Sequence, residues 1–189
     1  MECIRINEPQ TLFDIKQGNF QAGEVISSKK KLGDLSGVFI DEKKRQEMDQ
    51  SQVIYEVDCY FPVAEGKEGG LFWGVTRIFP GKVGNEYFMT RGHFHAQLDT
   101  AEFYWGISGE GIIIFMDQER NCRAEYVKPN SLHYIPGCIA HRVVNIGNDT
   151  LVFGACWGSD AGHDYGSIEQ HGFSARVIEK EGIPVLIKN

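Results

Sequence analysis

The 189-residue sequence contains no long apolar run and no secretion-type start. Its longest apolar stretches, such as residues 111–116, are far shorter than the ~20 residues that a membrane-spanning helix needs. The first residues, MECIR, lack the basic region, apolar core and small-residue cleavage site of a signal peptide. We therefore expect no membrane segment in this protein.

The sequence also lacks paired cysteines and an excess of basic residues. Its five cysteines are odd in number, and none forms a CxxC pair. This pattern favours reduced thiols in a cytoplasmic protein. With 19 basic and 26 acidic residues, the net charge of −7 argues against a nucleic-acid partner, which normally requires a basic patch. A small anionic substrate is still compatible with this charge, because a few local donors suffice to bind it.

Glycine is abundant, with 22 residues, and turn motifs separate short stretches rich in β-branched and aromatic residues. Such closely spaced short strands predict an all-β sandwich or barrel rather than alternating strands and helices. We expect helix only at residues 41–50 and 167–171. The predicted strands cover residues 53–60, 70–79, 86–90, 101–107, 111–116, 123–127, 132–135, 142–146, 151–157, 175–179 and 184–187.

The chain length fits a single domain covering residues 1–189. Residues 1–50 are less regular in pattern than the rest. We expect them to form an N-terminal arm that packs on the barrel or on a partner subunit.

The stretch TRGHFHAQLDTAEFY carries the strongest chemical signal. His93 and His95 are two residues apart, so their side chains leave a strand on the same face. Glu102 begins the next predicted strand, and His141 begins another after a Pro-Gly turn. Three imidazoles and a carboxylate suit a first-row divalent metal and leave coordination positions open for catalysis. The alternative is a set of hydrogen-bonded interior residues, which is hard to satisfy with four converging polar groups.

These residues resemble the cupin signature. Glu102 and Gly109 keep the six-residue gap of its first motif, and Pro136, His141 and Asn145 match its second motif. Six residues separate His95 from Glu102, which is longer than the usual three or four. The resemblance implies a double-stranded β-helix (jelly-roll) barrel of two antiparallel sheets with metal inside.

The sequence is most similar to the cupin-type glucose-6-phosphate isomerases. The similarity runs from about residue 32 to residue 178, and its most specific part is the stretch DAGHDYG at residues 160–166. The family is a metal-dependent cytoplasmic homodimer that interconverts glucose 6-phosphate and fructose 6-phosphate. Iron is the metal most associated with it, and manganese, zinc or nickel can substitute.

The resemblance also implies the residues of the site. The implied metal ligands are His93, His95, Glu102 and His141. The residues implied to surround the sugar phosphate are Tyr55, Thr76, Thr90, Gly92, Tyr104, His163 and Tyr165.

The expected chemistry assigns a role to each part of this set. Glu102 is the candidate to carry a proton between C1 and C2 of the sugar, although a hydride shift would need no such base. His163 and Tyr165 form a plausible pair for ring opening, while a structural bond between His163 and Asp164 is the alternative. The phosphate would be held by uncharged groups: the hydroxyls of the predicted tyrosine and threonines and the Gly92 amide.

Strand alternation also predicts what lies outside the site. Arg91 should point away from its neighbours Thr90 and Gly92, and Arg142 should point outward beside His141. We expect His133 and His171 to be structural or surface residues.

Three other readings share these residues. A metal site of three histidines and a carboxylate also serves oxygenases and decarboxylases, which would consume oxygen or a small organic acid. A sugar-phosphate isomerase of different specificity, for example for mannose 6-phosphate, fits equally well. A sugar-binding cupin without turnover would be inert toward sugar phosphates.

Overall fold

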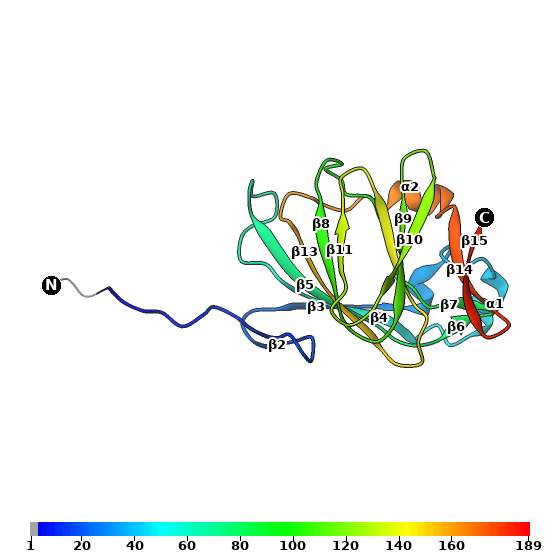
Figure 1. Ribbon diagram of the computed structural model, residues 1–189, viewed down its shortest axis with the longest axis horizontal. Helices are drawn as coiled ribbons and strands as arrows, with labels where there is room; N and C mark the ends of the chain where they lie inside the picture. Colours follow the sequence, from blue (N-terminus) through cyan, green and yellow to red (C-terminus); the bar gives the residue numbers. More distant parts are fainter. Residues whose placement is uncertain (1–3) are drawn as a thin grey trace.

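The computed structural model describes residues 4–189 and consists almost entirely of antiparallel strands. Two sheets form the barrel (Figure 1). The six-stranded sheet has the order β11 (Leu132–Ile135), β8 (Glu102–Ser108), β13 (Leu151–Gly158), β5 (Leu71–Ile78), β4 (Val53–Tyr60) and β3 (Ile26–Lys31). The three-stranded sheet has the order β10 (Cys122–Val127), β9 (Gly111–Met116) and β12 (Ala140–Asn145).

The two barrel sheets face each other across a shared interior. The Tyr104 ring on β8 lies 5.4 Å from the His141 ring on β12, centroid to centroid. Strand β9, with the sequence GIIIFM, is the central strand of the three-stranded sheet and is buried along its whole length. The predicted all-β jelly-roll barrel of two antiparallel sheets is therefore confirmed.

Smaller elements cover one end of the barrel. A four-stranded sheet has the order β15 (Ile183–Lys188), β14 (Ala175–Lys180), β7 (Glu86–Tyr87) and β6 (Lys82–Val83). Helices α1 (Glu42–Glu47) and α2 (Gly166–His171) are one or two turns long. Both lie inside or at the ends of the predicted helical segments, and Asp41 caps α1 by accepting a hydrogen bond from the Lys44 amide.

The predicted arm, residues 1–50, contains more regular structure than the sequence indicates. Strands β1 (Leu12–Asp14) and β2 (Asn19–Ala22) form a hairpin, and β3 is an edge strand of the barrel sheet, paired with β4. The short 3-10 helix η1 (Leu32–Leu35) buries two leucines in the core. Only the described residues before β1 extend away from the body, as the blue trace in Figure 1 shows.

Strand β3 escaped prediction because its sequence, ISSKKK, shows no apolar alternation and all six residues are exposed. It forms because its partner β4 offers a free edge, so the pairing depends on tertiary structure rather than on local propensity. In the described residues, no helix is both long enough and apolar enough to cross a membrane. The four cysteines that the structure describes are half-buried free thiols, and Cys3 lies outside the described residues.

Candidate metal centre and adjoining cavity

Four side chains converge between the two barrel sheets. Their potential ligand atoms, from His93, His95, Glu102 and His141, all lie within 4.8 Å of one another. Opposite ligands of one ion at ~2.1 Å are about 4 Å apart, so the four groups are spaced for a single ion. The sequence-predicted ligand set is thus brought together in space from three segments: the loop that carries His93 and His95, strand β8 and strand β12.

Local backbone geometry places the first two histidines. His93 pairs with His141 of β12 through an isolated antiparallel bridge, with the His141 amide donating to the His93 carbonyl at 3.1 Å. Phe94, between the two histidines, is buried on the opposite side, as strand alternation requires. Gly92 precedes this bridge with a φ of +77°, and a Cβ there would lie 2.6 Å from Phe173 and 2.9 Å from the His141 carbonyl. Only glycine fits that turn.

The orientation of the imidazoles fits a metal. His95 Nδ1 lies 2.9 Å from the Thr100 carbonyl, which can only accept, so Nδ1 carries the proton and Nε2 keeps its lone pair. His141 Nδ1 contacts the Ile139 carbonyl in the same way at 3.4 Å. Among the described residues, the buried Nε2 atom of His93 has no hydrogen-bond partner, and His141 Nε2 contacts only the Glu102 carboxylate. Buried polar atoms without partners are rare, and His93 belongs to the group of ligand atoms that lie within 4.8 Å of one another.

Glu102 lies at the centre of this group. Its Oε1 is 2.6 Å from His141 Nε2 and 3.2 Å from His95 Nε2. Burial acts to raise the pKa of Glu102, but the charges and hydrogen bonds of His141 and His95 outweigh it and hold the pKa below its usual range. Burial and the neighbouring His141 and His163 lower the pKa of His93. Anionic carboxylate and neutral imidazole are the forms that bind a metal.

The longer gap between His95 and Glu102 has a structural reason. Residues 96–101 form a turn in which Thr100 contacts His95 through both its carbonyl and its hydroxyl, each at 2.9 Å. The same turn supports the second motif, because the Cys138 amide donates to the Leu98 carbonyl at 2.5 Å. The extra residues therefore orient His95 and stabilise the loop that precedes His141.

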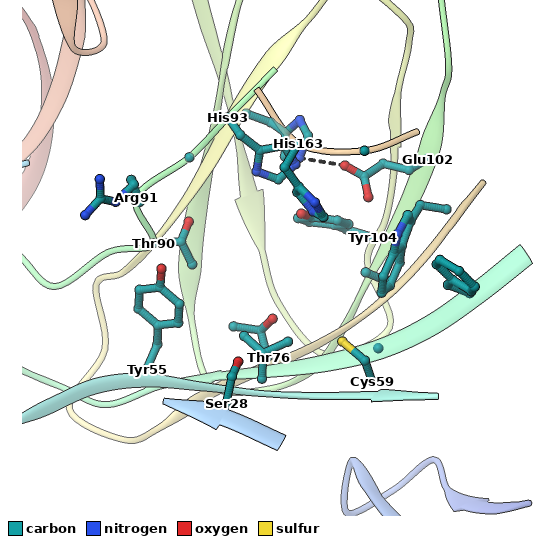
Figure 2. Close-up of a pocket in the computed structure, with 18 of the residues that line it drawn as sticks. Ser28, Tyr55, Cys59, Thr76, Thr90, Arg91, His93, Glu102, Tyr104 and His163 are labelled. Carbon is teal, nitrogen blue, oxygen red and sulfur yellow. Dashed lines mark ion pairs between the residues drawn. The ribbon is translucent and has the colours of Figure 1, made fainter. Parts of the chain in front are cut away.

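A cavity of about 470 Å³ opens beside the four ligands. Figure 2 shows Glu102, His93 and His163 on one side, and the side chains of Tyr55, Thr76 and Thr90 on the other. Every predicted site residue except the buried His95 lines the cavity. These residues are Tyr55, Thr76, Thr90, Gly92, His93, Glu102, Tyr104, His141, His163 and Tyr165.

The tyrosines of the cavity are hydrogen-bond donors at neutral pH. Burial raises the pKa of Tyr55 to about 12, and burial also raises the pKa values of Tyr104 and Tyr165. The Thr90 hydroxyl accepts a hydrogen bond from the Val143 amide at 3.1 Å, which fixes its position and leaves its proton free to donate. This end of the cavity is therefore rich in uncharged donors.

His163 and Tyr165 lie together at the mouth of the cavity. Their rings are parallel, with an interplanar angle of 6° and centroids 5.8 Å apart, and the His163 ring is 4.4 Å from that of His93. The cavity walls partly desolvate His163, which lowers its pKa and favours the neutral imidazole. The alternative expectation, a bond between the His163 and Asp164 side chains, is not realised: the Asp164 carboxylate instead accepts from the Gly166 amide at 2.8 Å.

Arg91 lies at the cavity wall, but its side chain points away from Thr90, in the predicted direction (Figure 2). Its guanidinium donates to the Glu169 carboxylate and to the Asp34 carbonyl. Residues 90–92 are not in a strand, so this direction comes from the local turn at Gly92 and not from strand pairing. Arg142 does leave the barrel interior, but it is only 2% exposed because β14 and α2 lie over it, as its contact with Phe173 between them shows.

Sequence reasoning missed several other lining residues. Ser28 and Lys30 reach the cavity from β3, whose polar sequence carries no signal for a strand. Phe61, Phe72 and Trp157 form an aromatic wall, with the Phe61 and Phe72 rings 4.5 Å apart. Sequence patterns predict such aromatic residues as core, and nothing in them tells a cavity wall from packed interior.

His133 and His171 are not part of the site. His133 is a buried residue of β11 that contacts Glu125 of β10 at 2.7 Å and Ser131 at 2.8 Å. His171 is an exposed residue at the end of α2.

With this geometry established, comparison with known proteins identifies the family. The family model described as "Glucose-6-phosphate isomerase (GPI)" matches residues 29–188. This chain belongs to the glucose-6-phosphate isomerase family. Glucose-6-phosphate isomerases from Thermococcus kodakarensis and Pyrococcus furiosus are 42% and 40% identical to it, each over 90% of this chain and 92% of the relative.

The relatives extend to Thermococcus litoralis, whose glucose-6-phosphate isomerase is 40% identical with the same coverage. Among solved structures, the chain is similar to oxalate decarboxylase from Bacillus subtilis, with 21% identity and a TM-score of 0.44. That match covers 58% of this chain and 26% of the decarboxylase.

Proposed function

We propose that this protein is a metal-dependent isomerase that interconverts glucose 6-phosphate and fructose 6-phosphate. The observation that supports the proposal is that one cavity contains both a set of metal-ligating side chains and a set of uncharged hydrogen-bond donors. Four metal-ligating side chains lie at one end, and uncharged donors lie at the other. Membership of the isomerase family supports the same substrate pair.

The donor end suits the phosphate of the substrate. The hydroxyls of Tyr55, Thr76 and Thr90 and the Gly92 amide are the proposed contacts, and all four residues line the cavity. Hydrogen bonds from neutral donors to a charged phosphate are stronger than neutral pairs, so a basic cluster is not required. This explains how a chain with a net charge of −7 can take an anionic substrate.

The ligand end suits the reacting carbons. His93, His95, Glu102 and His141 would hold a divalent metal, which would supply a Lewis acid for the sugar carbonyl. Glu102 is the proposed base, taking the proton from C2 of the open-chain aldose and returning it to C1. Tyr104 lies beside this carboxylate with its hydroxyl protonated and can hydrogen-bond a sugar oxygen.

His163 and Tyr165 are the proposed ring-opening pair. A neutral His163 can accept the proton of the anomeric hydroxyl and return it to the ring oxygen as the C–O bond breaks. Its lowered pKa and its place at the cavity mouth fit this role. The parallel ring of Tyr165 fixes the plane of the imidazole.

Iron(II) is the proposed resident metal, with manganese, zinc or nickel as substitutes, because mixed imidazole and carboxylate ligands suit this group. A cytoplasmic homodimer is the proposed physiological form. Exposed apolar side chains near the sheet edge support an interface, since Phe103, Leu132 and Tyr134 are 46%, 65% and 54% exposed on adjacent strands.

A substrate panel tests the proposed reaction. The metal-loaded chain is expected to convert fructose 6-phosphate into glucose 6-phosphate, followed by a coupled dehydrogenase. Mannose 6-phosphate tests for a different isomerase specificity, and oxygen uptake with small organic acids tests for an oxygenase. Turnover of either comparator without turnover of fructose 6-phosphate would overturn the proposal.

Isotope labelling tests the role of Glu102. Substrate deuterated at C2 should exchange part of its label with water if a carboxylate carries the proton. Complete retention of deuterium in the product would rule out that route and favour a hydride shift.

A further inference from the structure

A second cavity, of about 280 Å³, lies outside the barrel interior. It is lined by residues of the loop after η1, by Arg91 and Arg142, and by residues of the helix α2. Its rim includes Ser36 and Gly37, which are exposed, so solvent reaches it. None of the catalytic roles proposed above uses this outer cavity.

Arg142 is the feature of the outer cavity that needs explanation. Its Nε and Nη2 both donate to one acceptor, the Arg91 carbonyl, at 3.1 and 2.5 Å. A guanidinium has five N–H groups, and these two bonds leave the others, including both on Nη1, without a partner among residues 4–189. The ring of Phe173 packs 4.4 Å from the guanidinium carbon and offers no oxygen.

The other two buried arginines of the described chain differ from Arg142. Arg45 pairs with Glu42 at 2.6 Å, and Arg176 pairs with Glu86 at 2.8 Å. No carboxylate of residues 4–189 comes within ion-pair distance of Arg142. A buried charge without a counter-charge is costly, and proteins rarely keep one unless a ligand or partner supplies it.

The charged residues around the outer cavity favour an anion. Two arginines, Arg91 and Arg142, and one acidic residue, Glu169, line it. That carboxylate is already paired with Arg91. The planar fork of an unpaired guanidinium matches the oxygens of a phosphate group.

We propose that the outer cavity is a binding site for a phosphate-class oxyanion, with Arg142 as its principal contact. The anion supplies the counter-charge that Arg142 lacks. Arg91 lines both the outer cavity and the barrel cavity, and its carbonyl is held by Arg142. The outer site is therefore separate from the proposed substrate site but shares one arginine with it.

Equilibrium dialysis of the full chain against radiolabelled inorganic phosphate tests this site independently of isomerase activity. We expect two classes of bound phosphate per chain. Arg142→Gln should weaken one class at least tenfold, and Thr76→Val should weaken only the other. Glycerol 3-phosphate, added as competitor, distinguishes the sources: displacement of the Arg142-dependent class indicates a site that accepts phosphate esters, and no displacement indicates a site for the free ion.

A second pair of variants keeps the test valid if Arg142→Gln does not fold. Ser36 lies on the exposed rim, so Ser36→Glu should fold and should weaken the same class by adding negative charge, whereas Ser36→Gln should leave it unchanged. A single phosphate per chain that Thr76→Val alone weakens would overturn the proposal. Two classes that are both insensitive to Arg142→Gln and Ser36→Glu would overturn it as well.

Discussion

The two ends of the barrel cavity are built from different chemistry. One end gathers three imidazoles and a carboxylate whose ligand atoms lie within 4.8 Å of one another. The other end presents the hydroxyls of Tyr55, Thr76 and Thr90. This difference is the basis of the proposed roles, in which the first end changes bonds and the second holds the substrate in place. Variants at the two ends should therefore alter different kinetic constants.

The largest effect is expected at the ligand end. His141→Ala removes a buried imidazole whose Nε2 lies 2.6 Å from Glu102, so bound metal should be lost and turnover should fall more than the ~100-fold seen for outer-sphere partners. Metal analysis and steady-state kinetics measure both. His133→Ala is the matched control, since that histidine is also buried but contacts Glu125 and Ser131 instead. Equal loss of metal in His141→Ala and His133→Ala would contradict the assignment of His141 as a metal ligand.

The mouth of the cavity should give the next largest effect. His163→Gln should lower kcat about 10²–10⁴-fold on the closed sugar, the range for loss of a general acid–base group. The bound metal should be retained, because His163 is not one of the four ligands. Metal content measured beside kcat separates these outcomes, and parallel loss of both would remove His163 from its proposed role.

The donor end should affect binding rather than chemistry. Thr76→Val deletes one proposed phosphate contact of ~1.5–3 kcal/mol, so KM should rise about 10- to 150-fold with kcat nearly unchanged. Thr150→Val, which lies outside the cavity lining, is the control. A fall in kcat with constant KM would show that Thr76 acts on the transition state instead.

The smallest effect is expected at the Glu42–Arg45 pair of α1, which does not line the cavity and should change stability but not activity. The hydrogen bond from Arg45 lowers the pKa of Glu42 to about 2 from 4.5. The stabilisation is therefore present above pH 4.5 and is lost as the pH falls towards 2. Glu42→Gln should reduce the free energy of unfolding at pH 7 by less than about 1 kcal/mol, because the carboxylate is partly exposed.

Urea unfolding across this pH range measures the difference, which should vanish near pH 2. Glu47→Gln, an exposed position on the same helix, should show no such pH dependence. Isomerase activity should be unchanged in both variants. A loss of activity in Glu42→Gln would show that the cavity is not energetically separate from the end of the barrel.

Much of the fold could be predicted because its signals are local. Strands such as β9 and β11 have the predicted boundaries, since short apolar runs between turn residues define them. The ligand set was predictable because His93 and His95 lie on one face of an extended segment. Strand β3 was not predictable, since its polar sequence pairs only through the free edge of β4.

Two arginines show what strand alternation can and cannot predict. Arg91 points away from Thr90 as predicted, but its contacts with Glu169 and the Asp34 carbonyl come from segments far away in the sequence. Arg142 points out of the barrel as alternation predicts, yet α2 and β14 cover it. Local pattern gives the direction of a side chain, but its environment depends on segments distant in sequence.

The central claim is that turnover depends on one metal ion held by the four converging side chains. Its most direct test is to measure metal content and fructose 6-phosphate conversion before chelation, after chelation and after reloading with Fe²⁺ or Mn²⁺. The account predicts about one ion per chain, loss of conversion with the metal, and recovery on reloading. Undiminished conversion by the metal-free chain, or no conversion even when reloaded, would contradict it.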